Sequence, residues 1–254
     1  MSTVAFLHAH PDDEAIFTGG TMALLVEAGH RVVLIVATGG ELGVVGAHDD
    51  PLDAVRRGET ELAAELLGLH RVVFLGHHDS GMEGDPANEA PRSFWSADVA
   101  AAASEVAEVL RSEAADSFVV YDPHGIYGHP DHVQGHRVGL LAAQLAEIES
   151  VYEMTVDREY LHFVETHLVE QAAFGDDLGL AGSHIGYSSV EIDLTLDVRA
   201  QLGAKRAAMA AHVSQLPGEA PVFGLDERHF ADVYGWEWYV RRGPRGVLDE
   251  LAGR

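Results

Sequence analysis

Short apolar runs alternate with longer segments of helical periodicity along the first 157 residues of the chain. The runs are continuous and rich in β-branched side chains, which is typical of strands buried in a parallel sheet. The predicted strands are residues 4–7, 31–37, 71–75, 117–121 and 151–156. The predicted helices are residues 15–28, 51–67, 96–114 and about 129–149. This alternation predicts an α/β fold: a Rossmann-like, doubly wound, mostly parallel sheet with helices on both faces.

The pattern is less regular after residue 157. Residues 158–170 and 197–214 predict helices, 190–194 predict a strand, and 227–242 are rich in aromatic side chains. We expect a single domain over residues 1–254, with a parallel core (1–157) and a smaller C-terminal part (158–254) that covers the cleft.

Polar clusters follow four of the predicted strands, at residues 8–14, 38–43, 77–82 and 122–132. Right-handed crossovers place the carboxyl ends of parallel strands at one edge of a sheet, where α/β proteins bind their ligands. We therefore expect these clusters to converge in one cleft.

The first cluster contains His10 and Asp13, which are suitable ligands for zinc or a similar divalent ion. Taken alone, it also fits an acidic helix start, because carboxylates favour the positive end of a helix dipole. The second cluster decides between these readings, because His129 and His132 are three residues apart and share one helical face. We predict a metal site formed by His10, Asp13 and His132, which would also accept iron or cobalt.

The remaining residues of the two clusters fit the roles of proton carriers in metal-assisted hydrolysis of an amide or ester. Asp12 is predicted to take a proton from a water whose pKa the ion lowers. His129 is predicted to donate a hydrogen bond or a proton to the oxyanion or the leaving group. Asp131 is predicted to orient His129 and to raise its pKa.

Composition narrows the classes of partner. The chain has no cysteine, so a metal must bind to His, Asp and Glu, and 16 histidines are available. The formal charge of −25 disfavours nucleic acid and anionic lipid as partners. No apolar run reaches the length of a membrane span, and the N-terminus lacks the pattern of a signal peptide, so we expect a cytoplasmic protein without membrane insertion.

The pairing of Ala9-His10-Pro11-Asp12-Asp13-Glu14 with His129-Pro130-Asp131-His132 resembles the LmbE/PIG-L family of zinc-dependent N-deacetylases. The resemblance implies one zinc per chain on His10, Asp13 and His132, Asp12 as the base and His129 as the acid or oxyanion partner. It also implies that Tyr127 polarises the substrate carbonyl. Weaker similarity extends to residues 38–41, 56–59, 79–82 and 205–215. Arg56, Asp79 and Glu41 are the expected sugar contacts, although each also fits an ordinary structural role.

We therefore expect a zinc-dependent amidohydrolase that removes acetyl from an N-acetylglucosamine-like sugar or a related small conjugate. An amidase acting on mycothiol S-conjugates is the alternative with the same site. A non-catalytic sugar-binding module is a third possibility, but it would not need Asp12 and His129. The sequence leaves open the oligomeric state and the roles of the following residues, which fit either packing or contact with the site: His8, His77, His78, His124, His212, Gln215, Trp236 and Trp238.

Overall fold

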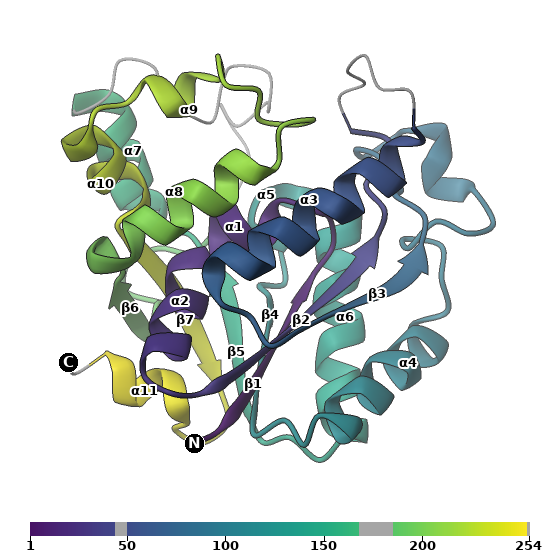
Figure 1. The fold of residues 1–254 in the computed structure, drawn as a ribbon. Coiled ribbons are helices and arrows are strands. Elements are labelled where there is room, and N and C mark those ends of the chain that lie inside the picture. The colour runs from purple at the N-terminus through teal and green to yellow at the C-terminus, as the bar shows by residue number, and fades with distance from the viewer. Residues whose placement is uncertain (44–49, 168–184, 253–254) are drawn as a thin grey trace.

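A seven-stranded sheet in the order β3-β2-β1-β4-β5-β7-β6 forms the centre of the molecule (Figure 1). The computed structural model describes residues 1–43, 50–167 and 185–252. The strands are β1 (Thr3–His8), β2 (Arg31–Thr38), β3 (Arg71–His77), β4 (Ser117–Tyr121), β5 (Ser150–Thr155), β6 (Leu194–Asp197) and β7 (Trp236–Arg242). Strands β1 to β5 are parallel, β7 runs antiparallel to β5, and β6 runs antiparallel to β7. The predicted α/β fold with a mostly parallel sheet is confirmed.

Helices cover both faces of the sheet (Figure 1). They are α1 (Asp13–Phe17), α2 (Gly19–Glu27), α3 (Leu52–Leu67), α4 (Val99–Ser112), α5 (Gly125–Gly128), α6 (Pro130–Leu145), α7 (Arg158–His167), α8 (Leu202–Ala211), α9 (Pro221–Gly224), α10 (Glu227–Tyr234) and α11 (Val247–Leu251), with 3-10 turns at Pro86–Glu89 and Arg199–Gln201. Because side chains alternate along a strand, Val4 and Phe6 of β1 pack toward α2, α3 and α8, whereas Ala5 and Leu7 pack toward α4 and α6. No helix within the described ranges has the length and apolar character needed to cross a membrane.

The helix predicted over residues 15–28 is wrong as a single element, because the chain breaks at Thr18 into α1 and α2. The second and third backbone amides of α2, those of Gly20 and Thr21, each donate to the carboxylate of Glu237 on β7 at 2.8 Å. A helix leaves its first amides without internal partners, so a carboxylate at this point favours a new helix start.

Glu237 is also the partner of Lys205, the only lysine of the chain. Lys205 Nζ on α8 lies 2.6 Å from Glu237 Oε1, and the two side chains are 1% and 2% exposed. This buried ion pair therefore joins α8, β7 and the start of α2, three elements that are distant in sequence.

Two other predicted helices are shorter in the structure, and a third is described only in part. The helix predicted to reach residue 149 ends at Leu145, because Glu147 takes a positive φ of 58° that no α-helix accommodates. The helix predicted over 96–114 spans only Val99–Ser112, and Ala114 has a φ of 49°. The helix predicted over 158–170 is present as α7 at Arg158–His167, and residues 168–170 lie outside the described residues.

The C-terminal predictions were the least accurate. The strand predicted over 190–194 is wrong: Val190 is exposed in a turn closed by a hydrogen bond from Glu191 N to Ser188 O, and β6 begins at Leu194. The helix predicted over 197–214 is shortened to α8, because Asp197 ends β6. The aromatic segment 227–242 forms α10 and the antiparallel strand β7.

Candidate active site and metal centre

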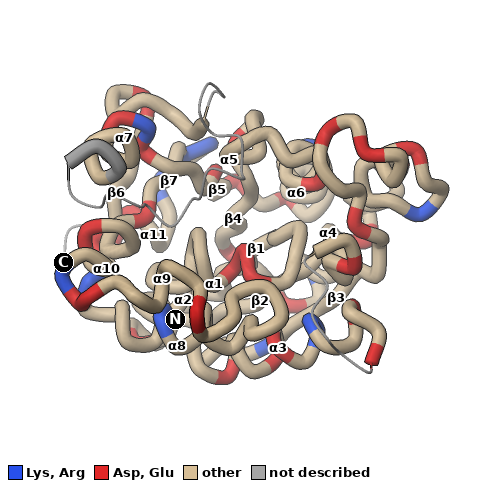
Figure 2. The backbone as a smooth tube through the Cα atoms, turned by 90° about the horizontal axis from the view of Figure 1, so that it is seen from above, with Lys and Arg blue, Asp and Glu red and all other residues tan. Residues whose placement is uncertain are grey.

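The loops that follow β1 and β4 meet at the carboxyl edge of the sheet, because these two strands are hydrogen-bonded neighbours. Figure 2 looks onto this edge and shows acidic residues at the end of β1. His10 and Asp13 follow β1, whereas His129 and His132 stand at the start of α6. All four side chains are buried. The structure thus brings together the two clusters that the sequence singles out.

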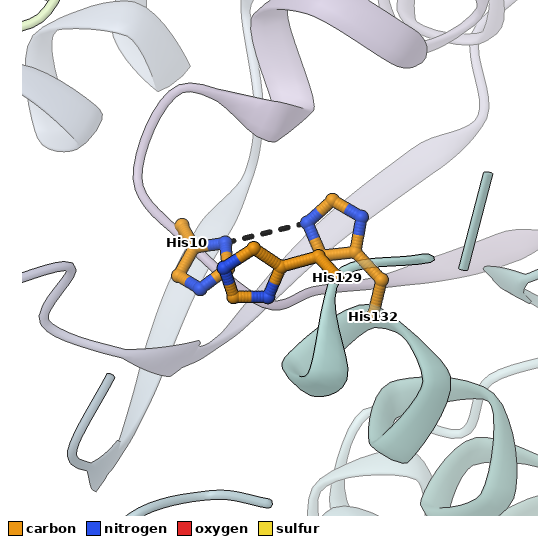
Figure 3. Close-up of side chains that lie close together, drawn as sticks. All are labelled: His10, His129 and His132. Atoms are coloured by element: carbon orange, nitrogen blue, oxygen red, sulfur yellow. Dashed lines mark hydrogen bonds between the residues drawn. The ribbon is translucent and has the colours of Figure 1, made fainter. Parts of the chain in front are cut away.

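The donor atoms of His10, Asp13 and His132 form a nearly equilateral triangle. His10 Nδ1 lies 3.3 Å from Asp13 Oδ2 and 3.3 Å from His132 Nε2 (Figure 3). His132 Nε2 lies 3.2 Å from Asp13 Oδ2. Zinc ligands at about 2.0–2.2 Å from the ion stand roughly 3.3–3.6 Å apart in a tetrahedral site. The donor types and their spacing therefore fit zinc or a similar divalent ion.

His129 offers a further nitrogen to the same region. Ligand atoms of His10, His129 and His132 lie within 4.8 Å of one another, and so do those of His10, Asp79, His129 and Asp131. The triangle that includes Asp13 is tighter, and it leaves His129 free for the substrate. The assignment of His10, Asp13 and His132 as the metal ligands stays a prediction.

Hydrogen bonds on the outer side of both rings hold them in an orientation suited to metal binding. His10 Nε2 donates to Asp131 Oδ2 at 3.1 Å, and His132 Nδ1 donates to the backbone oxygen of Gly125 at 3.2 Å. A proton on the outer nitrogen leaves the inner nitrogen with a free lone pair, as a metal ligand requires.

Asp13 is kept ionised in this setting. Burial alone would raise its pKa, but His132 and His10 hold the pKa of Asp13 well below its usual range. Tyr121, the last residue of β4, donates from its hydroxyl to Asp13 Oδ2 at 2.7 Å and stacks on the His132 ring with centroids 4.2 Å apart.

The carboxylate of Asp131 contacts His10 and not His129, contrary to the prediction. It also accepts hydrogen bonds from the backbone N–H (2.9 Å) and the hydroxyl of Ser80. The hydrogen bond between His129 and Asp131 is made by the backbone of Asp131: His129 Nδ1 accepts from Asp131 N at 3.1 Å and so caps the start of α6. Burial, with His10 and His132 nearby, lowers the pKa of His129, where the prediction was that Asp131 would raise it. A neutral His129 that accepts at Nδ1 carries its proton on Nε2 and can donate it in a hydrogen bond.

Asp12 has an unusual backbone conformation, with a φ of 104°. Such strain in a non-glycine residue persists only where the surroundings hold it, and it is common at functional sites. Its backbone N–H donates to Glu14 Oε2 at 3.0 Å, and its Oδ2 accepts from Arg56 Nη2 at 3.1 Å. Burial raises the pKa of Asp12 to about 6, although Arg56 opposes the increase. A carboxylate with this pKa is suited to exchange a proton near neutral pH.

Arg56, the expected sugar contact, is only 4% exposed and donates to the protein itself. Besides Asp12, its guanidinium donates to the backbone oxygens of Gly40, at 2.6 Å, and Pro11. Gly40 has a φ of 63°, and a Cβ at this position would collide with Arg56. Arg56 thus fixes the turn that carries Asp12, and contact with a sugar stays a prediction.

Glu14 and His212 form a second support for Asp12. His212, just after α8, donates from Nε2 to Glu14 Oε1 at 2.6 Å, and both side chains are fully buried. Although burial opposes the increase, Glu14 raises the pKa of His212. The other oxygen of Glu14 accepts from the backbone N–H of Asp12, so His212 in the C-terminal half of the chain is linked through Glu14 to the turn at Asp12.

The other predicted substrate contacts lie around the same edge. Asp79 Oδ1 is 3.6 Å from His10 Nε2, and the Asp79 backbone N–H donates to Glu41 Oε1 at 3.1 Å. The ring of Tyr127 lies 5.0 Å from that of His132. The structure therefore gathers Glu41, Asp79 and Tyr127 near the metal triangle, and their contact with substrate stays a prediction.

Most of the residues that the sequence left open have partners within the protein. His8 is buried against Thr18 at 2.8 Å, and burial lowers its pKa to about 4. Trp238 packs on Tyr160 with ring centroids 5.5 Å apart. The other contacts are His77 with Glu105, His78 with Glu41, the His124 ring with Tyr187, the Trp236 ring with Arg199, and Gln215 with Ser214.

Sequence reasoning assigned no role in the site to Tyr121 or Ser80. Tyr121 is the last residue of a buried strand and directly precedes the second cluster. Its hydroxyl at the end of that strand could have indicated a role in the site. Ser80 lies in the cluster at 77–82, but nothing local indicates that it contacts Asp131.

The chain is similar to known deacetylases over most of its length. The model of the family PIG-L, described as GlcNAc-PI de-N-acetylase, matches residues 5–143. The chain is 36% identical to a 1D-myo-inositol 2-acetamido-2-deoxy-alpha-D-glucopyranoside deacetylase of Geodermatophilus obscurus, covering 96% of this chain and 93% of the relative. It is also 36% identical to the protein of the same description from Thermomonospora curvata, covering 96% and 91%.

Solved structures share the fold. N,N'-diacetylchitobiose deacetylase from Pyrococcus horikoshii aligns with a TM-score of 0.62 and 23% identity, covering 95% of this chain and 84% of the other. The zinc-inhibited form of teicoplanin deacetylase Orf2 aligns with a TM-score of 0.61 and 17% identity, covering 96% and 100%.

Proposed function

Because this chain belongs to the PIG-L family of GlcNAc-PI de-N-acetylases, we propose that it is a metal-dependent hydrolase that cleaves the acetamide bond of an N-acetylglucosamine-like sugar. The observation that carries the proposal is that Asp12 shares the wall of one cavity with Asp13, a member of the triangle of His10, Asp13 and His132. The printed activity of relatives that are 36% identical supports the substrate class.

Zinc is the proposed ion, with Fe²⁺ or Co²⁺ as substitutes that the same donors accept. When bound, the ion supplies Lewis acidity toward water and toward the substrate carbonyl. His10, Asp13 and His132 would hold it.

Asp12 is the proposed proton carrier. It takes a proton from the attacking water while the water oxygen bonds to the carbonyl carbon. It then delivers this proton to the nitrogen of the departing amine as the C–N bond breaks, so the products are a free amine and acetic acid, which ionises to acetate at neutral pH. A pKa of about 6 suits both steps, because the group is ionised at pH 7 and still a competent acid once protonated.

His129 is the proposed donor to the oxygen that becomes negative during the attack. Its Nδ1 accepts from the Asp131 backbone, so the donor is Nε2–H. Tyr127 is the proposed second donor. Each such donor contributes roughly 10²–10³-fold to the rate in comparable sites.

The test is release of free amine from N-acetylglucosamine and from its inositol glycoside by zinc-loaded protein. Asp12→Asn should retain the metal, measured by mass spectrometry, and lose about 10²–10⁴-fold in kcat. The matched control is Glu61→Gln, because Glu61 is an exposed carboxylate of α3 that pairs with Arg57. Full activity in Asp12→Asn, or no amine from any N-acetylated sugar, would contradict the proposal.

A further inference from the structure

An apolar cavity of about 230 Å³ adjoins the proposed catalytic residues. Asp12, Asp13 and Tyr127 form part of its wall. The rest is almost entirely aliphatic or aromatic and comes from both halves of the chain, including Ile16, Phe17, Val156, Met209, Leu216 and Val222. A smaller hollow of about 30 Å³ shares Ile16, Phe17 and Val156 and continues toward Trp238. A sugar hydroxyl would find few hydrogen-bond partners in this cavity.

The wall also contains a strained residue. Ile126 has φ 62° and ψ −59°, a conformation that a β-branched side chain rarely adopts. Its side chain is buried in the cavity wall, and its backbone oxygen accepts from Gly186 N at 2.7 Å. Strain of this kind concentrates at sites that contact ligands.

A polar hollow lies on the other side of β1. It measures about 630 Å³ and is lined by groups such as Glu41, Asp53, His77, His78 and Arg92. Among the described residues, the two hollows share no wall residue. The polar hollow is lined by residues at the ends of β2 and β3, such as Thr38 and His77, whereas Ile126 and Val156 of the apolar cavity follow β4 and β5. In the sheet, β1 lies between β2 and β4.

This division gives an amide bound beside Asp12 two different surroundings. We infer that the apolar cavity is a subsite for an acyl chain, so that the enzyme also hydrolyses N-acyl amines whose straight acyl chain is longer than acetyl. The sugar of the amine part lies toward the polar side. A water-sized group occupies roughly 30 Å³, so the cavity has room for about seven such groups. This is far more than the single methyl of an acetyl group needs. The inference rests on the proposed deacylase function, and water cleaves the same C–N bond to give a longer carboxylic acid.

The first test is a series of N-acetyl-, N-butanoyl-, N-hexanoyl- and N-decanoylglucosamine with zinc-loaded protein, read out as free amine. We expect kcat/KM to rise by about fourfold for each buried methylene until the cavity is full, between hexanoyl and decanoyl. Val222→Trp should lower the ratio of hexanoyl to acetyl kcat/KM by about tenfold. Val213→Trp, on an exposed side chain outside the cavity wall, is the matched control and should leave the ratio unchanged.

The second test measures binding without turnover. Zinc-loaded Asp12→Asn should bind N-hexanoylglucosamine at least tenfold more tightly than N-acetylglucosamine in calorimetry. Equal kcat/KM or equal affinity along the series would overturn the subsite. The subsite would also be overturned if affinity increased with octyl N-acetylglucosaminide and not with N-octanoylglucosamine. The cavity would then bind the octyl group of the aglycone and not an acyl chain. Loss of acetyl cleavage itself would instead contradict the proposed function, and the binding series would still test the subsite.

Discussion

Replacing Arg56 with Met is expected to move the acid limb of the pH–rate profile to higher pH. Arg56 Nη2 lies 3.1 Å from Asp12 Oδ2, and the two side chains are 4% and 18% exposed. Burial raises the pKa of Asp12 to about 6, and Arg56 is the main influence that lowers it. Asp12 acts as a base only when it is ionised, so activity is lost as the pH falls through this pKa. Removal of the Arg56 cation raises the pKa of Asp12 further, so the loss of activity begins at a higher pH.

The size of the shift follows from the geometry. Two charges at this separation interact by about 5 kcal/mol at an effective dielectric constant of ~20, and one pKa unit corresponds to roughly 1.4 kcal/mol. Because the Asp12 side chain is partly solvated, we use the observed range for an aspartate beside an arginine, about 1–3 units. The acid limb should therefore move to about pH 7–9. Activity at pH 7 should fall by about 2- to 100-fold and return at higher pH.

The assay is kcat/KM between pH 5 and 10 for zinc-loaded wild type, Arg56→Met, Arg56→Lys and Arg111→Met. The ion is the same in all proteins, so its effect on Asp12 cancels in the comparison. Arg56→Lys keeps the cation and should stay near the wild-type limb. Arg111→Met is the control, because Arg111 is exposed, donates to the backbone oxygen of Leu145 at 3.1 Å and lines neither hollow. A uniform loss of activity in Arg56→Met with an unmoved limb would refute the reasoning.

Three further outcomes are expected. His10→Ala should lower the zinc content well below one ion per chain, measured by mass spectrometry, whereas loss of activity with full metal would argue against its role as a ligand. His212→Asn should lower kcat about tenfold with little change in KM or metal, because Glu14 then holds the strained turn at Asp12 less firmly. Lys205→Met should lower the free energy of unfolding by about 3–5 kcal/mol in urea titration, because Glu237 is left as an unpaired buried charge.

The parts of the fold that local pattern specifies were predictable. The buried run at β1 and the helix start at Pro130 predicted that His10, Asp13 and His132 would meet, because parallel neighbours end at one edge. The partner of Asp131 was not predictable, since it depends on where the loop carrying Ser80 lies. The prediction misplaced β6 and missed β7. Both strands pair through contacts between segments distant in sequence, which the local pattern does not show.

Arg56 shows the same limit on a helix. The sequence places it on α3, but nothing local indicates that its guanidinium turns inward to Gly40 and Pro11. Charged residues are rarely fully buried without partners, so the expectation of a solvent-facing or substrate-facing group was reasonable. The partners that reverse it come from two other loops, which only the folded chain assembles.

The positive φ of Asp12 explains how two adjacent carboxylates come to differ in chemistry. The turn directs Asp13 toward His10 and His132, which hold its pKa well below the usual range. It directs Asp12 toward Arg56, where burial raises its pKa to about 6. Neighbouring carboxylates whose surroundings separate their pKa values typically divide the work of ligand and proton carrier. In an extended or helical backbone at Asp12 the two side chains would take other directions, so the strained turn itself is part of the proposed mechanism.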